Sequence, residues 1–291
     1  MKMVVENGLY VFAMLNGFKE LPRTAIRFPN DVTLQPTPEF IKWKISIDTY
    51  FDMSVIPPYC LFYFEPIPTN KIMSFNTDDR VTEIEDEFNA VVDLLRLFKS
   101  GKIGIQLIIG IKAFTHEEGV ASLLAAFSYG SIHPIVKNEY SLCDAEINLL
   151  DTFYEQHYKG LISPDKLQDK LLGYAIMRFG LVTLWGDNRE KLIDLVISFE
   201  NIFGTGSKSR TPEQIARYLN DCNVDQSVVV NDMRKIYKYR NKMIHGSGLS
   251  HIDPDEFSNL LIRGEDYLRK TISKAIRLNE ERDERLIKIR N

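Results

Sequence analysis

The residue types that could carry out chemistry are concentrated in residues 234–248, which read RKIYKYRNKMIHGSG. Five of the first nine residues in this segment are basic, and two tyrosines lie among them. Basic side chains bind phosphate groups and tyrosine rings stack on nucleobases, so the segment favours binding of a nucleic acid. Lys238 and Lys242 are the candidate contacts to a nucleic-acid backbone, and Tyr237 or Tyr239 is the candidate platform for a base. Either tyrosine could instead pack inside the fold.

Three polar residues near the end of this segment are candidates for catalysis: Arg240, Asn241 and His245. An imidazole can donate and accept protons close to neutral pH, and the negative end of a helix dipole favours its protonated form. A guanidinium stays charged and can hold a phosphate through two donors, while an amide adds a neutral donor and acceptor. The alternative is that His245 only caps its helix and that Arg240 forms an ion pair.

The spacing of Arg240 and His245 complicates such a site. The two residues are five positions apart, which corresponds to about 140° around a helix at roughly 100° per residue. Their side chains therefore do not share one face of the helix. They could converge if the helix unwinds at Gly246, if the long Arg240 side chain reaches around the helix, or if a second subunit completes the site.

Helices are the elements that must position these residues, because proline nearly disappears after residue 141 and apolar residues recur at helical spacing. Three dipeptides place a capping side chain before a proline at the first helical position: Ser163 before Pro164, Thr211 before Pro212, and Asp253 before Pro254. The pattern predicts helices over residues 142–158, 164–183, 188–203, 212–219, 227–245 and 254–288. The charge-rich tail, residues 272–291, reads as a solvated helix.

The first 80 residues read as β-rich and irregular, because eight of the 12 prolines fall there and the apolar runs, such as 9–15 and 40–51, are short. Residues 59–66 (YCLFYFEP) predict a buried strand. A helix is expected over 81–98, and the isoleucine-rich residues 103–114 predict another strand. This region therefore predicts a mixed domain of sheet and helix.

Length and composition fit a globular protein with two domains. The 291 residues are 44% hydrophobic and 26% charged, which excludes disorder as the main state. We expect an α+β protein, with a mixed α/β domain of unknown role at 1–138 and an all-α bundle at 139–291. No run of about 18 apolar residues predicts a membrane span, and the N-terminus lacks the layout of a signal peptide. A soluble, cytoplasmic protein is therefore expected.

Charge and cysteine usage narrow the range of partners. Residues 231–291 hold 14 Lys and Arg against 10 Asp and Glu, a net charge of +4, whereas the rest of the chain has a net charge of -8. Only the C-terminal part is therefore suited to attract a polyanion. The three cysteines lie far apart without a CxxC pair, so neither a disulfide framework nor a cysteine zinc site is predicted. We find no convincing cluster of metal ligands.

The run KIYKYRNKMIHG resembles the final motif of HEPN domains, particularly those of the Apea-like branch. In that motif a long helix ends in an arginine, a polar residue, a short spacer and His-Gly, which correspond here to Arg240, Asn241, three spacer residues, His245 and Gly246. Upstream, LVISFENIFG at 195–204 is similar to the family's earlier helix, in which an apolar-Phe-Glu pattern precedes a glycine turn. The resemblance covers about residues 141–280, roughly half of the chain.

The resemblance implies a helical bundle that forms a homodimer, in which the Arg/His motifs of two subunits line one cleft. Many such domains are metal-independent endoribonucleases that act as toxins or antiviral effectors. In that role the 2′-hydroxyl of the RNA attacks the phosphate, His245 is general base or acid, and Arg240 stabilises developing charge. Asn241 would orient His245 or the phosphate, and Glu200 would support the site. No metal and no cofactor is implied.

Two alternatives remain open at the level of the sequence. The helical half could be a non-catalytic HEPN module that binds a nucleotide or a protein and mediates dimerisation. Alternatively, the N-terminal half could sense a ligand or regulator and control the helical half as its effector, which is compatible with nuclease activity.

Overall fold

The structure is a computed structural model that forms two compact units. The first comprises residues 1–92 and 101–152, and the second comprises 93–100 and 153–291. The predicted boundary between residues 138 and 139 lies outside the described residues. The structure describes residues 6–39, 41–42, 56–68, 71, 75–115, 121–128, 140–163, 167–184, 187–204, 210–246 and 252–290, without the side chains of 114–115, 121–128 and 290.

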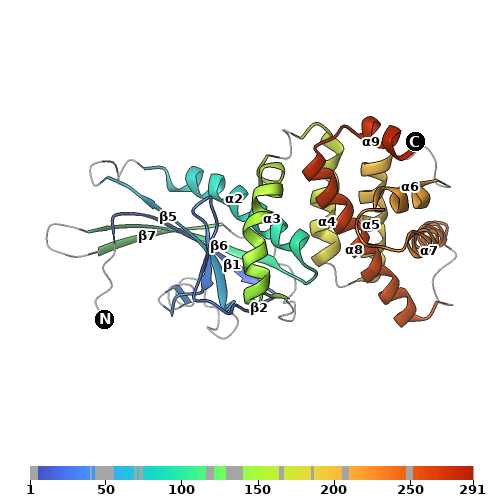
Figure 1. The fold of residues 1–291 in the computed structure, drawn as a ribbon. Helices are drawn as coiled ribbons and strands as arrows, with labels where there is room; N and C mark the ends of the chain where they lie inside the picture. Colours follow the sequence, from blue (N-terminus) through green and yellow to red (C-terminus); the bar gives the residue numbers. More distant parts are fainter. Residues whose placement is uncertain are drawn as a thin grey trace. The chain divides into compact units, whose positions relative to one another are not determined.

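An antiparallel sheet of six strands forms the centre of the first unit (Figure 1). Its order is β3-β4-β5-β1-β6-β7. The strands are β1 (Gly8–Asn16), β3 (Ile26–Arg27), β4 (Thr33–Pro36), β5 (Tyr59–Pro66), β6 (Gly104–Thr115) and β7 (Ala121–Ser128). Two further short strands, β2 (Phe18–Glu20) and β8 (Tyr140–Ser141), pair in parallel. The sheet and the helical second half confirm the predicted α+β class.

Strand β1 occupies the middle of the sheet, where it pairs with both β5 and β6. Its residues alternate between the two faces, yet nearly all of them are buried, so both faces of the sheet are covered along this strand. The buried cluster on one face includes Phe12 and Met14 of β1, Cys60 of β5, and Leu107 and Ile109 of β6. Strand β5 lies at the predicted residues 59–66, but only Cys60 and Leu61 of it are buried, so the prediction of a buried strand holds only in part. Strand β6 confirms the strand predicted over 103–114 to within one residue at each end.

Two helices, α2 (Thr77–Phe98) and α3 (Asp144–Ile162), contribute residues to both units. Helix α2 begins four residues before its predicted start at Val81, because the Asn76 side chain accepts hydrogen bonds from the backbone N–H groups of Asp78 and Asp79. The apolar side of α2 is buried as its periodicity predicts, with Phe88 fully buried.

The second unit is an all-α bundle, as predicted. Its further helices are α4 (Lys170–Leu184), α5 (Asn188–Phe203), α6 (Thr211–Tyr218), α7 (Gln226–Ile244), α8 (Pro254–Leu278) and α9 (Arg282–Arg290). Helix α5 is central, because it packs against α4, α6, α7 and α8. Gly264 on α8 permits close packing, since a Cβ at that position would lie 2.7 Å from Leu195 and 2.8 Å from Ile236.

Several helix limits differ from the prediction. The predicted helix 254–288 is broken at Asn279, which adopts a left-handed conformation with φ 45° and separates α8 from α9. Arg285 and Ile289 are buried, so the prediction of a solvated tail is wrong for α9. Helix α4 begins at Lys170, where the Asp169 side chain accepts from the backbone N–H of Leu171, and the predicted start at residue 164 lies outside the described residues.

The predicted cap of α6 is also wrong. Thr211 is the first residue of the helix, and Arg210 occupies the N-cap position without a capping hydrogen bond from its side chain. By contrast, Asp253 caps α8 as predicted, because its carboxylate accepts from the backbone N–H groups of Asp255 and Glu256. No helix in the described part of the chain is long and apolar enough to cross a membrane.

His157 on α3 is a buried titratable residue of the second unit, with only 3% of its surface exposed. Its two ring nitrogens lie 2.8 Å from the carbonyl oxygen of Phe153 and 3.2 Å from that of Ser273. Burial lowers the pKa of the imidazole, and the charge of Arg277 lowers it further, while the two carbonyl groups oppose this shift.

The lowered pKa of His157 predicts a loss of stability in acid. The unfolded chain binds the proton more tightly, so the contribution of neutral His157 is complete above about pH 6.5 and is lost as the pH falls through the lower folded pKa. In thermal unfolding from about pH 7.5 down to about pH 5.5, a window centred on the pKa of an unperturbed imidazole, the Tm of the wild type should fall more than that of His157→Gln. Equal pH dependence of the two proteins would contradict this assignment.

Candidate active site on helix α7

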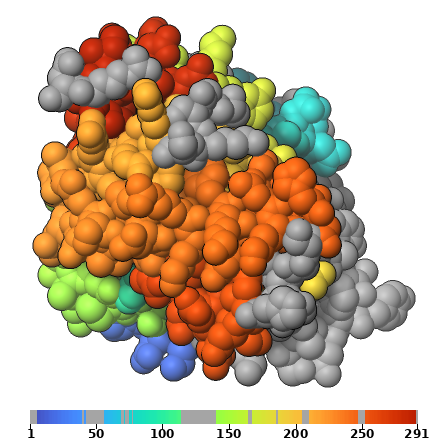
Figure 2. Space-filling view, turned by 90° about the vertical axis from the view of Figure 1, so that its right-hand side faces the viewer, coloured from blue at the N-terminus to red at the C-terminus, as the bar shows by residue number. Residues whose placement is uncertain are grey.

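Helix α7 carries the predicted catalytic and RNA-binding residues except Glu200 and His245. It begins at a capped position, because the Asp225 carboxylate accepts hydrogen bonds from the backbone N–H groups of Ser227 and Val228. One side of the helix is buried, including Val229, Met233 and Ile236, all at helical spacing. The other side faces outward, and α6 and α7 form much of the orange surface in Figure 2.

A buried carboxylate fixes α7 against α8, and the sequence analysis did not identify it. Asp232 accepts two hydrogen bonds from the Arg263 guanidinium, at 2.7 and 2.9 Å, and a third from the Tyr267 hydroxyl at 2.9 Å. These contacts satisfy a charge that would otherwise be costly to bury. The position of an aspartate among the apolar residues of α7 is the signal that could have indicated this role.

The end of α7 places His245 in solvent. Its backbone N–H donates to the Asn241 carbonyl at 3.0 Å, which continues the helical pattern, and Gly246 follows with a φ of 73°. The His245 side chain is exposed. The backbone is still helical up to His245 and departs from the helix only at Gly246. Unwinding at Gly246 therefore does not bring the imidazole onto the face of the helix that carries Arg240. A reaching Arg240 side chain and a second subunit are the two remaining routes to a joint site.

Arg240 and Asn241 interact with each other. The Arg240 Nη1 donates to the Asn241 Oδ1 at 3.3 Å, and both residues are partly buried. Among the described residues Arg240 has no ion pair, so the alternative in which a carboxylate neutralises its charge is not observed there. The Asn241 side chain contacts the Arg240 guanidinium rather than the His245 imidazole, and it therefore orients the guanidinium in this chain.

Tyr237 is buried, with 6% of its surface exposed, so it cannot present a ring face to a base. The prediction of Tyr237 as a base platform is wrong, and the alternative of a packed tyrosine holds. Burial raises the pKa of its phenol, the Glu200 carboxylate raises it further, and the Thr211 side chain and the charge of Arg240 oppose this. Glu200 of α5 and Arg240 of α7 thus both act electrostatically on the Tyr237 hydroxyl, with opposite effects on its pKa.

Tyr239 is only partly buried. Its ring packs edge-on against Phe257 of α8, with centroids 5.8 Å apart and planes at 73°. This geometry is favourable for aromatic pairs and uses part of the ring surface. Tyr239 is therefore the one of the two predicted tyrosines that keeps ring surface accessible to a base.

Two of the five cations in residues 234–242 are neutralised by ion pairs. Arg234 pairs with Glu213 of α6, and Lys235 pairs with Glu256 of α8 at 2.8 Å. Lys238 and Lys242 have no ion pair within the described part of the chain, and their spacing of four residues places them on one face of the helix. Together with Arg240 they leave unneutralised positive charge along the C-terminal half of α7, where a phosphate backbone could bind.

No metal-binding cluster is found at this site or elsewhere in the described ranges, since no three His, Cys, Asp or Glu side chains there are placed to hold an ion. The resemblance to HEPN domains has no independent support. The chain matches no protein-family model, no curated protein and no solved structure.

Proposed function

We propose that this protein is a metal-independent endoribonuclease of the HEPN type, which acts as a homodimer on single-stranded RNA. The observation that carries the proposal is the end of α7, where an exposed imidazole follows a partly exposed arginine and unpaired lysines on one basic helix. His245 supplies a group that exchanges protons near neutral pH. Arg240, Lys238 and Lys242 supply positive charge for the phosphate backbone.

The proposed reaction uses the 2′-hydroxyl of the RNA as the nucleophile. His245 removes the proton from this hydroxyl, the new bond from the 2′-oxygen to phosphorus forms, and the bond from phosphorus to the 5′-oxygen breaks. The leaving 5′-oxygen takes a proton from solvent, and the protonated His245 afterwards returns its proton to solvent. Arg240 stabilises the charge that develops on the phosphate oxygens. The products are a 2′,3′-cyclic phosphate and a 5′-hydroxyl.

Other residues support this arrangement. Asn241 holds the guanidinium of Arg240 through the observed hydrogen bond, and its amide N–H groups can bind a phosphate oxygen. Glu200 of α5 would support the site, since its carboxylate and the Arg240 guanidinium act with opposite effect on the pKa of the buried Tyr237 phenol. Tyr239 provides the remaining ring for stacking on a base.

The cellular role follows from the same hypothesis. A cytoplasmic toxin or antiviral effector would cleave RNA with the helical unit, and the unit that contains the sheet would respond to a ligand or regulator. The alternative is a non-catalytic module that keeps the helical fold and binds a nucleotide or a protein partner.

Cleavage of single-stranded RNA in the presence of EDTA tests the proposal. We expect the purified full-length protein to cut the RNA, and we expect the new 3′ ends to resist ligation until the cyclic phosphate is opened and the phosphate removed to leave a 3′-hydroxyl. RNA that stays intact at high protein concentration, with the protein folded and dimeric, would support the non-catalytic alternative.

A further inference from the structure

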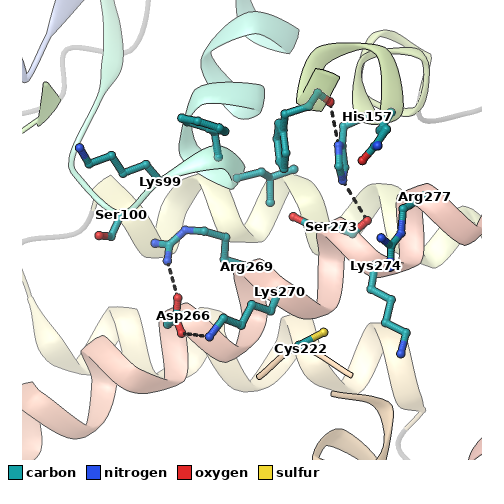
Figure 3. A pocket seen from close by; sticks show the side chains of 14 residues that line it. Lys99, Ser100, His157, Cys222, Asp266, Arg269, Lys270, Ser273, Lys274 and Arg277 are labelled. Carbon is teal, nitrogen blue, oxygen red and sulfur yellow. Dashed lines mark hydrogen bonds and ion pairs between the residues drawn. The ribbon is translucent and has the colours of Figure 1, made fainter. Parts of the chain in front are cut away.

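The second unit contains a hollow of about 420 Å³ (Figure 3). It is lined by the C-terminal end of α2, by α3, by Cys222 after α6 and by one face of α8. All of its lining residues belong to the same compact unit. Its volume is within the range of about 300–1,000 Å³ that is typical of small-molecule sites.

The lining of this hollow is strongly basic. Among the residues that line the hollow, Asp266 is the only one with a carboxylate. In the view of Figure 3 two cations lie near one end of the hollow, beside Ser100, and two lie near the other end, beside His157. The five lining cations are Lys99, Arg269, Lys270, Lys274 and Arg277.

These cations differ in how far they are already neutralised. Arg269 bonds to the carboxylates of Glu265 and Asp266, and Lys274 bonds to that of Asp221. Lys270 shares Asp266 with Arg269, at 2.8 Å.

Arg277 has no ion pair in the part of the chain that the structure describes. It lies seven residues after Lys270 on α8, or about 10 Å at 1.5 Å per residue. Seven residues are close to two turns, so both side chains project from the same side of the helix. A ligand with several phosphate groups can contact both side chains at once without either bending towards the other.

The remainder of the lining suits an organic group attached to such phosphates. Phe98 and Phe153 are partly buried, with ring centroids 5.3 Å apart. One face of Phe153 is stacked on His157, so the aromatic surface left for a ligand is that of Phe98 and the rest of the Phe153 ring. Ser100 and Ser273 add hydroxyl groups that can donate to a phosphate or accept from a base. Both ring nitrogens of His157 lie against carbonyl oxygens of the fold, so this residue is not counted among the ligand groups.

We propose that this hollow binds a small ligand with several phosphate groups, of the chemical class of a nucleoside triphosphate. The phosphates would lie along Lys270 and Arg277, and the base would pack at Phe98 and Phe153. The site is distinct from the end of α7. Lys235 of α7 pairs with Glu256 of α8, and the earlier residue Asp232 pairs with the later residue Arg263, so the two helices run in opposite directions. Helix α8 therefore runs away from His245 as it continues towards Arg277.

Calorimetric titration of the full-length protein with ATP and with inorganic tripolyphosphate tests the proposal. The double variant Lys270→Gln/Arg277→Gln should weaken binding of both probes by about tenfold or more, because it removes two charge-assisted contacts. Arg189→Gln removes one exposed cation of the same unit outside the hollow and should leave binding unchanged. His245→Ala should also leave it unchanged, which separates this proposal from the nuclease proposal.

Asp266→Asn provides a test that loss of folding cannot mimic. It removes the carboxylate that Lys270 and Arg269 share, while Arg269 keeps its bond to Glu265. Binding of both probes should become tighter than in the wild type. The proposal is overturned if neither probe binds, or if the double variant binds as the wild type does. Binding of single-stranded RNA alone, lost in the double variant, would also overturn it and assign the hollow to the path of the RNA.

Discussion

His245→Ala is expected to reduce the rate of RNA cleavage by about 10²–10⁴-fold, the usual contribution of a general acid or base. The imidazole is exposed and only the backbone of His245 takes part in the helix end. Removing the side chain should therefore leave folding and dimerisation intact. The measurement is the single-turnover rate on single-stranded RNA in EDTA, together with the thermal unfolding temperature and the molecular mass in solution.

Lys242→Ala is the matched control for His245→Ala. This variant lies three residues earlier on the same helix and removes a candidate phosphate contact rather than a proton-transfer group. It should weaken RNA binding and lower the salt dependence of binding, with a much smaller effect on the rate at saturating RNA. If His245→Ala purified as a folded dimer and cut RNA as fast as the wild type, the catalytic assignment would fail.

Arg285→Ala is expected to reduce the free energy of unfolding of the helical unit by about 3–5 kcal/mol, the cost of breaking a buried ion pair. Arg285 is fully buried on α9 and bonds to the Asp169 carboxylate at 3.1 Å and to the carbonyl oxygens of Ile202 and Glu280. Truncation leaves the Asp169 charge buried without its partner. Urea unfolding followed by helical circular dichroism measures this loss.

Arg234→Ala is the control for Arg285→Ala, because Arg234 also forms an ion pair but at the surface, with Glu213. Its loss should cost no more than about 1 kcal/mol. The double variant Arg285→Met/Asp169→Asn should recover part of the stability, since it removes both buried charges. Equal losses for Arg285→Ala and Arg234→Ala would show that α9 is not anchored as the structure describes.

Strong local signals made much of the fold predictable. Strand β5 and helix α5 have the predicted limits, because β5 is a short apolar run bounded by proline and α5 lies between the cap at Asp187 and the left-handed Gly204. The break at Asn279 could not be predicted, since the charged pattern continues through it and no glycine or proline marks it. The tertiary contacts of Arg285 bury one side of α9, and the periodicity of a sequence does not reveal such contacts.

The candidate site was predictable in its residue types but not in its arrangement. The glycine after His245 marked the end of α7, and the structure places that end within one residue. Which tyrosine packs inside depends on α5 and α6, which cover Tyr237 and leave Tyr239 partly exposed. The hollow was missed because its cations come from α2 and α8, which are distant in the sequence and show no common pattern.

Complementation between two inactive variants tests the central claim most directly. Arg240→Ala and His245→Ala should each cut RNA very slowly as homodimers. Co-expressed and purified together, they form mixed dimers in which the arginine of one copy and the histidine of the other are both present. We expect cleavage by the mixed dimer to rise well above that of either variant alone. A mixed dimer as slow as its parents, while the wild-type dimer cuts RNA, would contradict a site shared between two subunits.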